Sequence, residues 1–237
     1  MNNIFLYWEN LNGSKTPDYI DLCKESIIKY NSNDFNIILV NEKNLSDYID
    51  IHPSLLKIKK LAQKCDVIRV ALLYNHGGIW LDSDCINLKS LTEVYGLLES
   101  YDYIGYYNKQ NAIANGLMCS KKKCPFITDV YQYLLTKIEE KNDFEWEELG
   151  SIALNKFHKK HNNELYIFDI SYMSFIDWDK WNTFFKDYDT NYIPEHSYTA
   201  MLFNEAFKRN NIDLLKMNKQ QILNQNNLLG KLFRQNT

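Results

Sequence analysis

The sequence predicts a single α/β domain in which helices flank one sheet. Two features predict this fold class. Short apolar runs alternate with amphipathic helical patterns along most of the 237 residues, and neither a linker nor an internal repeat divides the chain. A chain of this length can bury one good core, with room for a small appendage. We therefore expect one domain over residues 1–210 and a polar helical tail, rich in Asn and Gln, over residues 211–237.

The first 40 residues predict a parallel strand–helix–strand unit. Residues 3–8 are an apolar run that is too short for a helix, which indicates a buried strand. Residues 16–31 begin with Thr-Pro, a helix-start signal, and carry apolar side chains on one face. Residues 35–40 form the second apolar run. Because parallel strands need a crossover connection, usually a helix, we expect these two strands to pair in parallel.

The longest helical pattern covers residues 57–76, and the glycine pair Gly77-Gly78 provides its C-cap. The apolar run 79–81 that follows is expected to be a short strand. The same spacing arguments apply to the rest of the chain. They predict strands over 101–107, 115–120 and 165–170, and helices over 125–140, 145–161 and 196–210.

Composition narrows the function classes. The net charge of −3 argues against a general nucleic-acid binder, which normally carries a basic excess. No stretch approaches the ~20 apolar residues that span a bilayer. The first residues lack the basic start and apolar stretch of a signal peptide. The five cysteines include no Cys-x-x-Cys pair, which fits reduced thiols in a cytoplasmic protein.

Asp82 and Asp84 stand at the end of the apolar run that starts from the glycine pair. A strand sends alternate side chains to opposite faces, so both aspartates point the same way and Ser83 points away. Two carboxylates aimed at one space bind a hard divalent cation such as Mg²⁺ or Mn²⁺. Open α/β sheets bind ligands at this end of their strands. The alternative is a polar turn that ends a strand, since Asp and Ser are common turn residues.

Asp66 and Arg69 share a face of the preceding helical pattern, because they are three residues apart. Their neighbours over residues 67–73 are almost all apolar, so the helix is expected to be buried nearly all round. Buried charges are rare without a partner or a ligand. We therefore expect a functional role for this pair. The alternative is an ion pair on the helix surface, worth ~0.2–0.5 kcal/mol.

These residues lie in one block, "CDVIRVALLYNHGGIWLDSDC", over residues 65–85. The block resembles the signature of the DXD-containing sugar transferases of glycosyltransferase family 32 and of the similar bacterial capsular-polysaccharide-synthesis proteins. The glucosyltransferase domains of large clostridial toxins share it. That signature reads Ser-Asp-x-x-Arg, an apolar helix, Tyr-x-x-Gly-Gly, an apolar strand and Asp-x-Asp. Cys65 stands where Ser is usual. The resemblance covers residues 3–135 well and the remainder loosely.

The resemblance implies a GT-A fold, which is a Rossmann-like α/β domain with a single mixed sheet. It also implies a nucleotide-sugar donor and a bound Mn²⁺ or Mg²⁺. By position, Trp8 would stack on the nucleotide base, a role that an indole face suits. Tyr7 and Ser83 would belong to the same donor-binding region. The alternative for Trp8 is a core residue that covers the end of the first strand.

The resemblance further implies roles for the charged residues. Asp66 and Arg69 would contact the sugars of the donor, Arg69 by forked hydrogen bonds. Asp82 would reach the ribose or, through water, the metal, and Asp84 would ligate the metal directly. Related enzymes often add a late histidine to the metal shell. His196 is the best-placed candidate, and the alternative is a surface histidine.

Three further residues, Asn115, Glu148 and Asp177, are expected on the acceptor side. The implied reaction is transfer of a sugar, with retained anomeric configuration, from a nucleotide sugar to a saccharide or lipid-linked saccharide in capsule or lipopolysaccharide synthesis. A UDP-sugar is the favoured donor. The alternatives are a haloacid-dehalogenase-type phosphatase and a non-catalytic nucleotide-sugar-binding subunit. The apolar residues of the tail "LLGKLFRQNT" are candidates for peripheral contact with the inner membrane face, or for packing on the domain.

Overall fold

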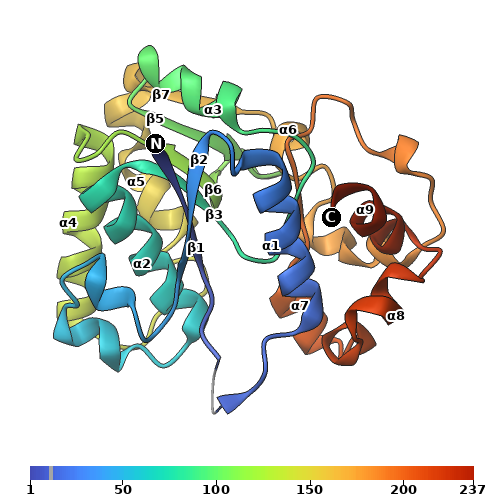
Figure 1. Cartoon of the computed structure of the whole chain (residues 1–237). Coiled ribbons are helices and arrows are strands. Elements are labelled where there is room, and N and C mark those ends of the chain that lie inside the picture. Colours follow the sequence, from blue (N-terminus) through green and yellow to red (C-terminus); the bar gives the residue numbers. More distant parts are fainter. Residues whose placement is uncertain (11–12) are drawn as a thin grey trace.

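The core of the fold is the parallel pairing of the first strand with two others in one mixed sheet (Figure 1). The computed structural model describes residues 1–10 and 13–237. Over these residues the sheet has the strand order β2-β1-β3-β6-β5-β7, and β6 alone is antiparallel to its neighbours. Its strands are β1 (Asn2–Tyr7), β2 (Phe35–Val40), β3 (Gly78–Leu81), β5 (Tyr103–Tyr107), β6 (Ile113–Ser120) and β7 (Leu165–Phe168).

Helices cover both faces of this sheet. On one face α2 (Leu61–His76), α4 (Pro125–Glu140) and α5 (Ser151–His161) pack side by side and bury Phe5 and Trp80. On the opposite side lie α1 (Asp18–Asn31) and the carboxyl-terminal helices (Figure 1). Period-two alternation explains the division, because neighbouring strand residues such as Ile4 and Phe5 belong to different core clusters.

The carboxyl-terminal region completes the second layer. A short antiparallel pair joins β4 (Cys85–Asn87) to β8 (Thr199–Met201), and three helices follow. These are α7 (Asn204–Arg209), α8 (Lys219–Leu223) and α9 (Leu228–Asn236). Short helices α3 (Thr92–Gly96) and α6 (Ile170–Met173) connect the remaining strands, together with several 3₁₀ segments, the longest of which covers Trp178–Phe185.

The tail packs on the domain. The four apolar side chains expected to contact a membrane are fully buried against α1 and the adjoining helices. Those residues are Leu228, Leu229, Leu232 and Phe233. The Tyr30 hydroxyl also donates to Asn236 Oδ1 at 2.9 Å. In this conformation the tail therefore has no free apolar face to present to a lipid surface, and it forms part of the domain core.

Most expected elements are present, and three helices need correction. The helix expected over 57–76 begins only at Leu61, because residues 53–57 form a separate 3₁₀ segment. The helix expected over 145–161 begins only at Ser151, because residues 145–150 cross the sheet edge as a turn-rich segment. The helix expected over 196–210 is wrong in its first half. There the chain forms β8, and α7 begins after Phe203, which has a left-handed backbone at φ 61°. Pairing of β8 with β4 overrides the local helical pattern.

All five cysteines are unpaired. Among the residues that the structure describes, no helix has the length and apolar character needed to cross a membrane.

The glycine pair fixes where β3 begins, and this yields a stability prediction. Gly78 has φ +98°, and a Cβ there would lie 2.5 Å from the Asn3 carbonyl oxygen. We expect Gly78→Ala to lower the free energy of unfolding by more than about 1 kcal/mol. Strain of a left-handed backbone alone costs about 1–3 kcal/mol, and the clash with the Asn3 carbonyl adds to it. Urea denaturation followed by circular dichroism measures this change.

Gly96→Ala is the matched control, since no heavy atom lies within 4 Å of a Cβ at that helical position. It is expected to leave the protein as stable or slightly more stable. Equal effects of the two substitutions would contradict the argument.

Candidate active site

The two aspartates lie in a turn that joins β3 to β4, held at both ends by the sheet. The backbone N–H of Asp82 donates to the carbonyl of Gly116 on β6 at 2.8 Å. The Ser83 hydroxyl donates to the carbonyl of Tyr7, the last residue of β1, at 2.8 Å. The two carboxylates thus stand at the carboxyl ends of the central parallel strands, where open α/β sheets bind ligands. Ser83 itself is buried and joins two strand ends, so its hydroxyl is not directed at a ligand.

Arg69 is the hub of the charged cluster. Its Nη1 lies 3.1 Å from Asp82 Oδ1 and its Nη2 lies 3.3 Å from Asp66 Oδ1. Nη1 also donates to the carbonyl of Asn115, and Nε donates to the carbonyl of Cys65 at 3.4 Å. The guanidinium carbon stands 5.1 Å from the centre of the Trp80 ring. With its side chain only 7% exposed, Arg69 is almost closed off from solvent.

These contacts do not fit the expectation that Arg69 grips the donor sugars. Each of its three guanidinium nitrogens already has a protein acceptor. A buried guanidinium in this setting orients carboxylates and offsets their repulsion. Burial alone would lower the pKa of Arg69, but the adjacent Asp82, Cys65 and Asp66 raise it above its ordinary value. In this structure Arg69 therefore holds Asp66 and Asp82 in place, and a contact between Arg69 and the donor stays a prediction.

Asp66 lies beside Asn115, one of the residues expected on the acceptor side. The Asn115 amide donates to Asp66 Oδ1 at 2.8 Å. Gly150 closes against both, since a Cβ there would lie 2.6 Å from Asn115 Nδ2 and 3.1 Å from Asp66 Oδ2. Burial, together with Asp82 and Glu147, raises the pKa of Asp66 to about 6 despite the nearby Arg69. The structure thus brings Asp66, Arg69, Asp82 and Asn115 into one cluster.

Asp84 receives its support from the far end of the chain. The backbone N–H of Asn204, at the start of α7, donates to Asp84 Oδ2 at 2.7 Å. The N–H of Leu202 donates to the Asp84 carbonyl at 2.9 Å. The Asn204 side chain in turn accepts the Tyr19 hydroxyl at 2.5 Å. Asn204 and Tyr19 were not expected from the sequence, because nothing in their local pattern signals contact with residues so distant in the chain.

The carboxylates suit a divalent cation. Burial, followed by the charge of Asp82, raises the pKa of Asp84 to about 6, and burial also raises the pKa of Asp82. No other described residue donates a hydrogen bond to Asp82 Oδ2 or Asp84 Oδ1, so each aspartate keeps an oxygen free for a ligand. Oxygen donors of this kind match Mg²⁺ or Mn²⁺.

The protein alone does not provide a full coordination shell. In the part of the chain that the structure describes, no three His, Cys, Asp or Glu side chains are grouped so that they could hold a metal ion. The remaining ligands would have to come from water and from a bound phosphate, as Mg²⁺ commonly requires.

His196 lies apart from the aspartates. Its Nε2 is 2.9 Å from the Ser171 hydroxyl, and its ring packs on Tyr172 with centroids 4.4 Å apart. Among the described residues, His196 is not grouped with Asp82 and Asp84 in a set that could hold a metal ion.

The first strand ends in a mixed environment. Trp8 is partly exposed and packs against the buried apolar residues shared by α1 and the carboxyl-terminal helices. Its Nε1 donates to Asn10 Oδ1 at 3.0 Å. Part of the Trp8 side chain is thus open to solvent near the strand end. Tyr7 is buried and its hydroxyl donates to Glu9 at 2.6 Å, so the Tyr7 side chain faces the protein. Burial, with this hydrogen bond, raises the pKa of Tyr7 far above its ordinary value.

The other two residues expected on the acceptor side occupy different surroundings. Glu148 is paired with Lys141 at 2.8 Å and accepts the Glu145 N–H at 3.0 Å, so it stabilises its own loop. Its neighbour Glu147 is the residue whose charge acts on Asp66. Asp177 accepts the Trp178 N–H at 2.8 Å and lies 3.5 Å from Lys109 in the β5–β6 hairpin.

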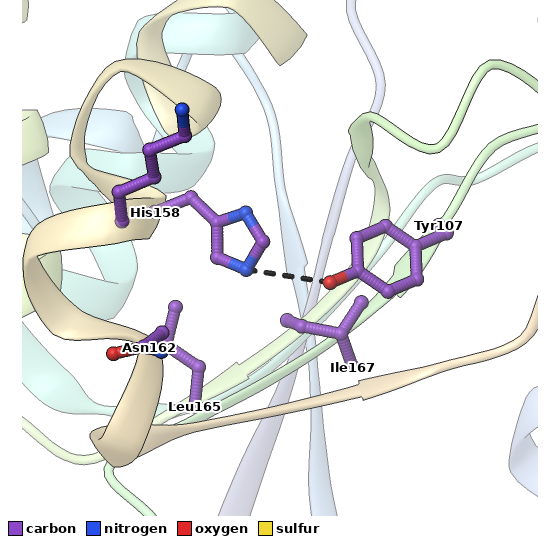
Figure 2. A pocket seen from close by; sticks show the side chains of 6 residues that line it. Tyr107, His158, Asn162, Leu165 and Ile167 are labelled. Carbon is purple, nitrogen blue, oxygen red and sulfur yellow. Dashed lines mark hydrogen bonds between the residues drawn. The ribbon is translucent and has the colours of Figure 1, made fainter.

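A separate depression of about 400 Å³ lies between α5 and the β5–β7 edge of the sheet (Figure 2). There the Tyr107 hydroxyl and His158 Nε2 are 3.3 Å apart. The depression is lined by Tyr107, His158, Lys159, Asn162, Leu165 and Ile167. None of the residues expected to form the site lines this depression, and it contains no carboxylate.

Sequence comparison identifies one family. The sequence model of a family described as "Capsular polysaccharide synthesis protein" matches residues 1–229. No curated protein matches the chain in sequence.

Several solved structures have a similar fold. PaToxG glycosyltransferase is 17% identical, with a TM-score of 0.51 over 67% of this chain and 69% of that one. Mouse xyloside xylosyltransferase 1, in its apo form, is 11% identical, with a TM-score of 0.54 over 86% of this chain and 98% of that one. A glycosyltransferase involved in glycosylation of the major capsid of PBCV-1 is 13% identical, with a TM-score of 0.53 over 91% of this chain and 100% of that one. At such identities the similarity concerns the fold, which is that of GT-A glycosyltransferases.

The position of Arg69 yields a prediction that separates a positioning role from a donor-binding one. Removing its charge leaves Asp66 and Asp82 close together without a counter-ion, and breaking a buried pair in this way costs about 3–5 kcal/mol. We expect Arg69→Ala to lower the thermal midpoint clearly, by roughly 10 °C or more at the size of this chain. Thermal unfolding followed by circular dichroism measures the shift.

Lys208→Ala is the control, because Lys208 forms an exposed pair with Glu205 at 3.1 Å on the surface of α7. Such pairs contribute about 0–1 kcal/mol. An unchanged thermal midpoint of Arg69→Ala, together with strongly reduced donor turnover, would instead support a direct contact between Arg69 and the donor.

Proposed function

Because this chain belongs to the family of capsular polysaccharide synthesis proteins, we propose that it is a metal-dependent, retaining glycosyltransferase. It transfers a sugar from a nucleotide-sugar donor, for which a UDP-sugar is favoured, to a saccharide or lipid-linked saccharide acceptor. The observation that carries the proposal is the pair of free carboxylate oxygens on Asp82 and Asp84 at the carboxyl end of β3. The GT-A fold supports the same enzyme class. Neither the family nor the fold supports the phosphatase alternative.

The carboxylates would hold the cation through their free oxygens, Asp84 directly and Asp82 directly or through water. When bound, such a cation stabilises the negative charge that develops on the departing diphosphate. The residues of the chain contribute by holding this geometry in advance. Arg69 and Trp80 fix Asp82, and the N–H of Asn204 fixes Asp84, so little reorganisation is needed when substrate arrives.

The donor would lie across the ends of β1 and β3. Trp8 would stack on the base, and the turn at Asp82 would face the diphosphate. Asp66 and Asn115, which are hydrogen-bonded to each other, would then lie beside the transferred sugar. With this order along the rim, the acceptor would lie beyond β6, toward the segment in which Gly150 approaches Asp66 and Asn115.

The proposal is tested by incubating the full chain with a panel of UDP- and GDP-sugars and Mn²⁺ while measuring release of nucleoside diphosphate. We expect turnover with a UDP-sugar, loss of turnover in excess chelator and recovery on addition of Mn²⁺ or Mg²⁺. Asp84→Asn should reduce turnover by about a hundredfold or more, since one well-placed electrostatic group contributes about 10²–10³ to the rate.

Asp187→Asn is the control, because Asp187 is 80% exposed and pairs with Lys231 on the surface. It should leave the rate unchanged. Donor binding without any turnover would identify a non-catalytic sugar-nucleotide-binding subunit, and full turnover in chelator would remove the cation from the proposal. Preference for GDP-sugars would overturn the donor assignment alone.

Trp8 provides a separate test of the base-binding position. Stacking on a base contributes about 1–3 kcal/mol, so Trp8→Ala should weaken UDP binding by roughly tenfold to a hundredfold. Titration calorimetry with Mn²⁺ present measures the dissociation constant. Trp178→Ala, which removes an exposed indole from another segment, should leave it unchanged. Equal UDP affinity in Trp8→Ala and the intact protein would place the base elsewhere.

A further inference from the structure

A loop reaches over one side of the aspartate cluster. Residues 144–150 begin where the Gln63 side chain of α2 donates to the Phe144 carbonyl at 2.7 Å. They end where Gly150 packs against Asp66 and Asn115. The loop is thus fixed to α2 at one end and to the site at the other. Trp146 lies between these anchors and is 49% exposed, which is unusual for a tryptophan.

A helix approaches from the opposite side. Helix α7 begins at Asn204, whose N–H is bonded to Asp84, and it ends at Arg209. Five residues of α-helix advance about 7.5 Å, so Arg209 lies roughly one and a half turns from Asp84. Its guanidinium carbon stands 4.7 Å from the centre of the Trp146 ring.

Trp146 and Arg209 therefore connect the two sides of the site. Trp146 belongs to the loop that ends beside Asp66, and Arg209 belongs to the helix that begins beside Asp84. The two residues are far apart in the chain but in contact in the structure. We refer to these two residues as the Trp146–Arg209 bridge. Both side chains are substantially exposed, so core packing does not account for their contact.

The positive charge of Arg209 has no carboxylate paired with it among the described residues, whereas its neighbour Lys208 is paired with Glu205 at 3.1 Å. A guanidinium stacked on an indole keeps its N–H edge free, and this edge matches the paired oxygens of a carboxylate or phosphate.

We propose that the Trp146–Arg209 bridge is the acceptor-binding subsite and that it selects an acceptor sugar that carries an oxyanion. This inference rests on the proposed glycosyltransferase function. The indole provides a flat apolar surface for the face of a sugar ring, and the guanidinium edge binds a carboxylate or phosphate on that sugar. Without Arg209, the carboxylates of Asp66, Asp82, Asp84 and Glu147 would repel such an acceptor.

Binding of simple saccharides tests the subsite independently of turnover. The full chain, with UDP and Mn²⁺ present, is titrated with three probes by ligand-observed NMR: methyl glucoside, methyl glucuronide and glucose 1-phosphate. The glucuronide presents a carboxylate on the ring, and glucose 1-phosphate presents the phosphate at the anomeric position. We expect at least one anionic probe to bind about tenfold or more tightly than the neutral glucoside, the factor of one charge-assisted hydrogen bond. The preferred probe identifies the source of the oxyanion.

Arg209→Gln should abolish this preference while leaving neutral glucoside binding nearly unchanged, and Trp146→Ala should weaken all three probes. Lys208→Gln and Trp178→Ala are matched controls, since Lys208 is the paired neighbour on α7 and Trp178 is an exposed tryptophan not stacked on Arg209. Both controls should behave as the intact protein. An intact protein without anionic preference, or an equal loss in Lys208→Gln, would overturn the proposal.

Hydrolysis of the donor by water, measured for each variant, distinguishes this inference from the proposed function. The control variants Lys208→Gln and Trp178→Ala should retain that hydrolysis within about threefold, because neither residue belongs to the proposed subsite or to the aspartate pair. If the intact protein hydrolyses no donor at all, the proposed function fails, whatever the saccharide binding shows.

Discussion

The arrangement of the site depends on one buried, positively charged side chain, that of Arg69. Arg69 joins α2, the turn after β3 and the start of β6 through contacts to Asp66, Asp82 and the Asn115 carbonyl. Two carboxylates this close in a poorly solvated place would repel one another, and one of them would keep its proton. The guanidinium offsets that repulsion. The carboxyl ends of the central strands can therefore carry several carboxylates without loss of stability. The remaining negative charge is what a divalent cation would neutralise under the proposed function.

The second support of the site comes from the carboxyl-terminal layer. The pairing of β4 with β8 sets the register at which Leu202 and Asn204 meet Asp84. Phe203 turns the chain between them with a left-handed backbone, a conformation that costs a non-glycine residue of order 1–3 kcal/mol. The burial of α9 against α1 holds this layer in place. The tail that the sequence marked as an appendage therefore contributes to the geometry around Asp84.

Much of the fold could be predicted from local pattern. The strands over 35–40 and 79–81 and the helix over 125–140 match the structure within one residue, because apolar periodicity and glycine or proline signals are local properties. The block around Asp82 and Asp84 predicted the GT-A fold and the capsular-polysaccharide-synthesis family, and the comparisons confirmed both. Strand β8 was missed because its stability comes from pairing with β4, more than 100 positions earlier.

The site was predictable to a similar degree. Its acidic residues stand out in sequence, and Asn115 does lie beside Asp66. The commitment of Arg69 to protein acceptors and the off-site position of His196 depend on the packing of the chain, which one sequence does not reveal. The roles of Asn204, Glu147 and the Trp146–Arg209 bridge arise from contacts between distant segments, for which spacing gives no signal.

The hydrogen bond from Asn204 to Asp84 closes a loop of 120 residues. Long-range closures of this kind cost chain entropy before they return any contact energy, so they tend to form late in folding. The strand order allows most of the sheet to assemble first, with Asp82 already beside Arg69. Asp84 acquires its final orientation only when residues 199–237 dock. Under the proposed function, affinity for the cation and the donor would be coupled to the docking of α7 to α9, and a bound substrate would stabilise this layer more than the rest of the protein.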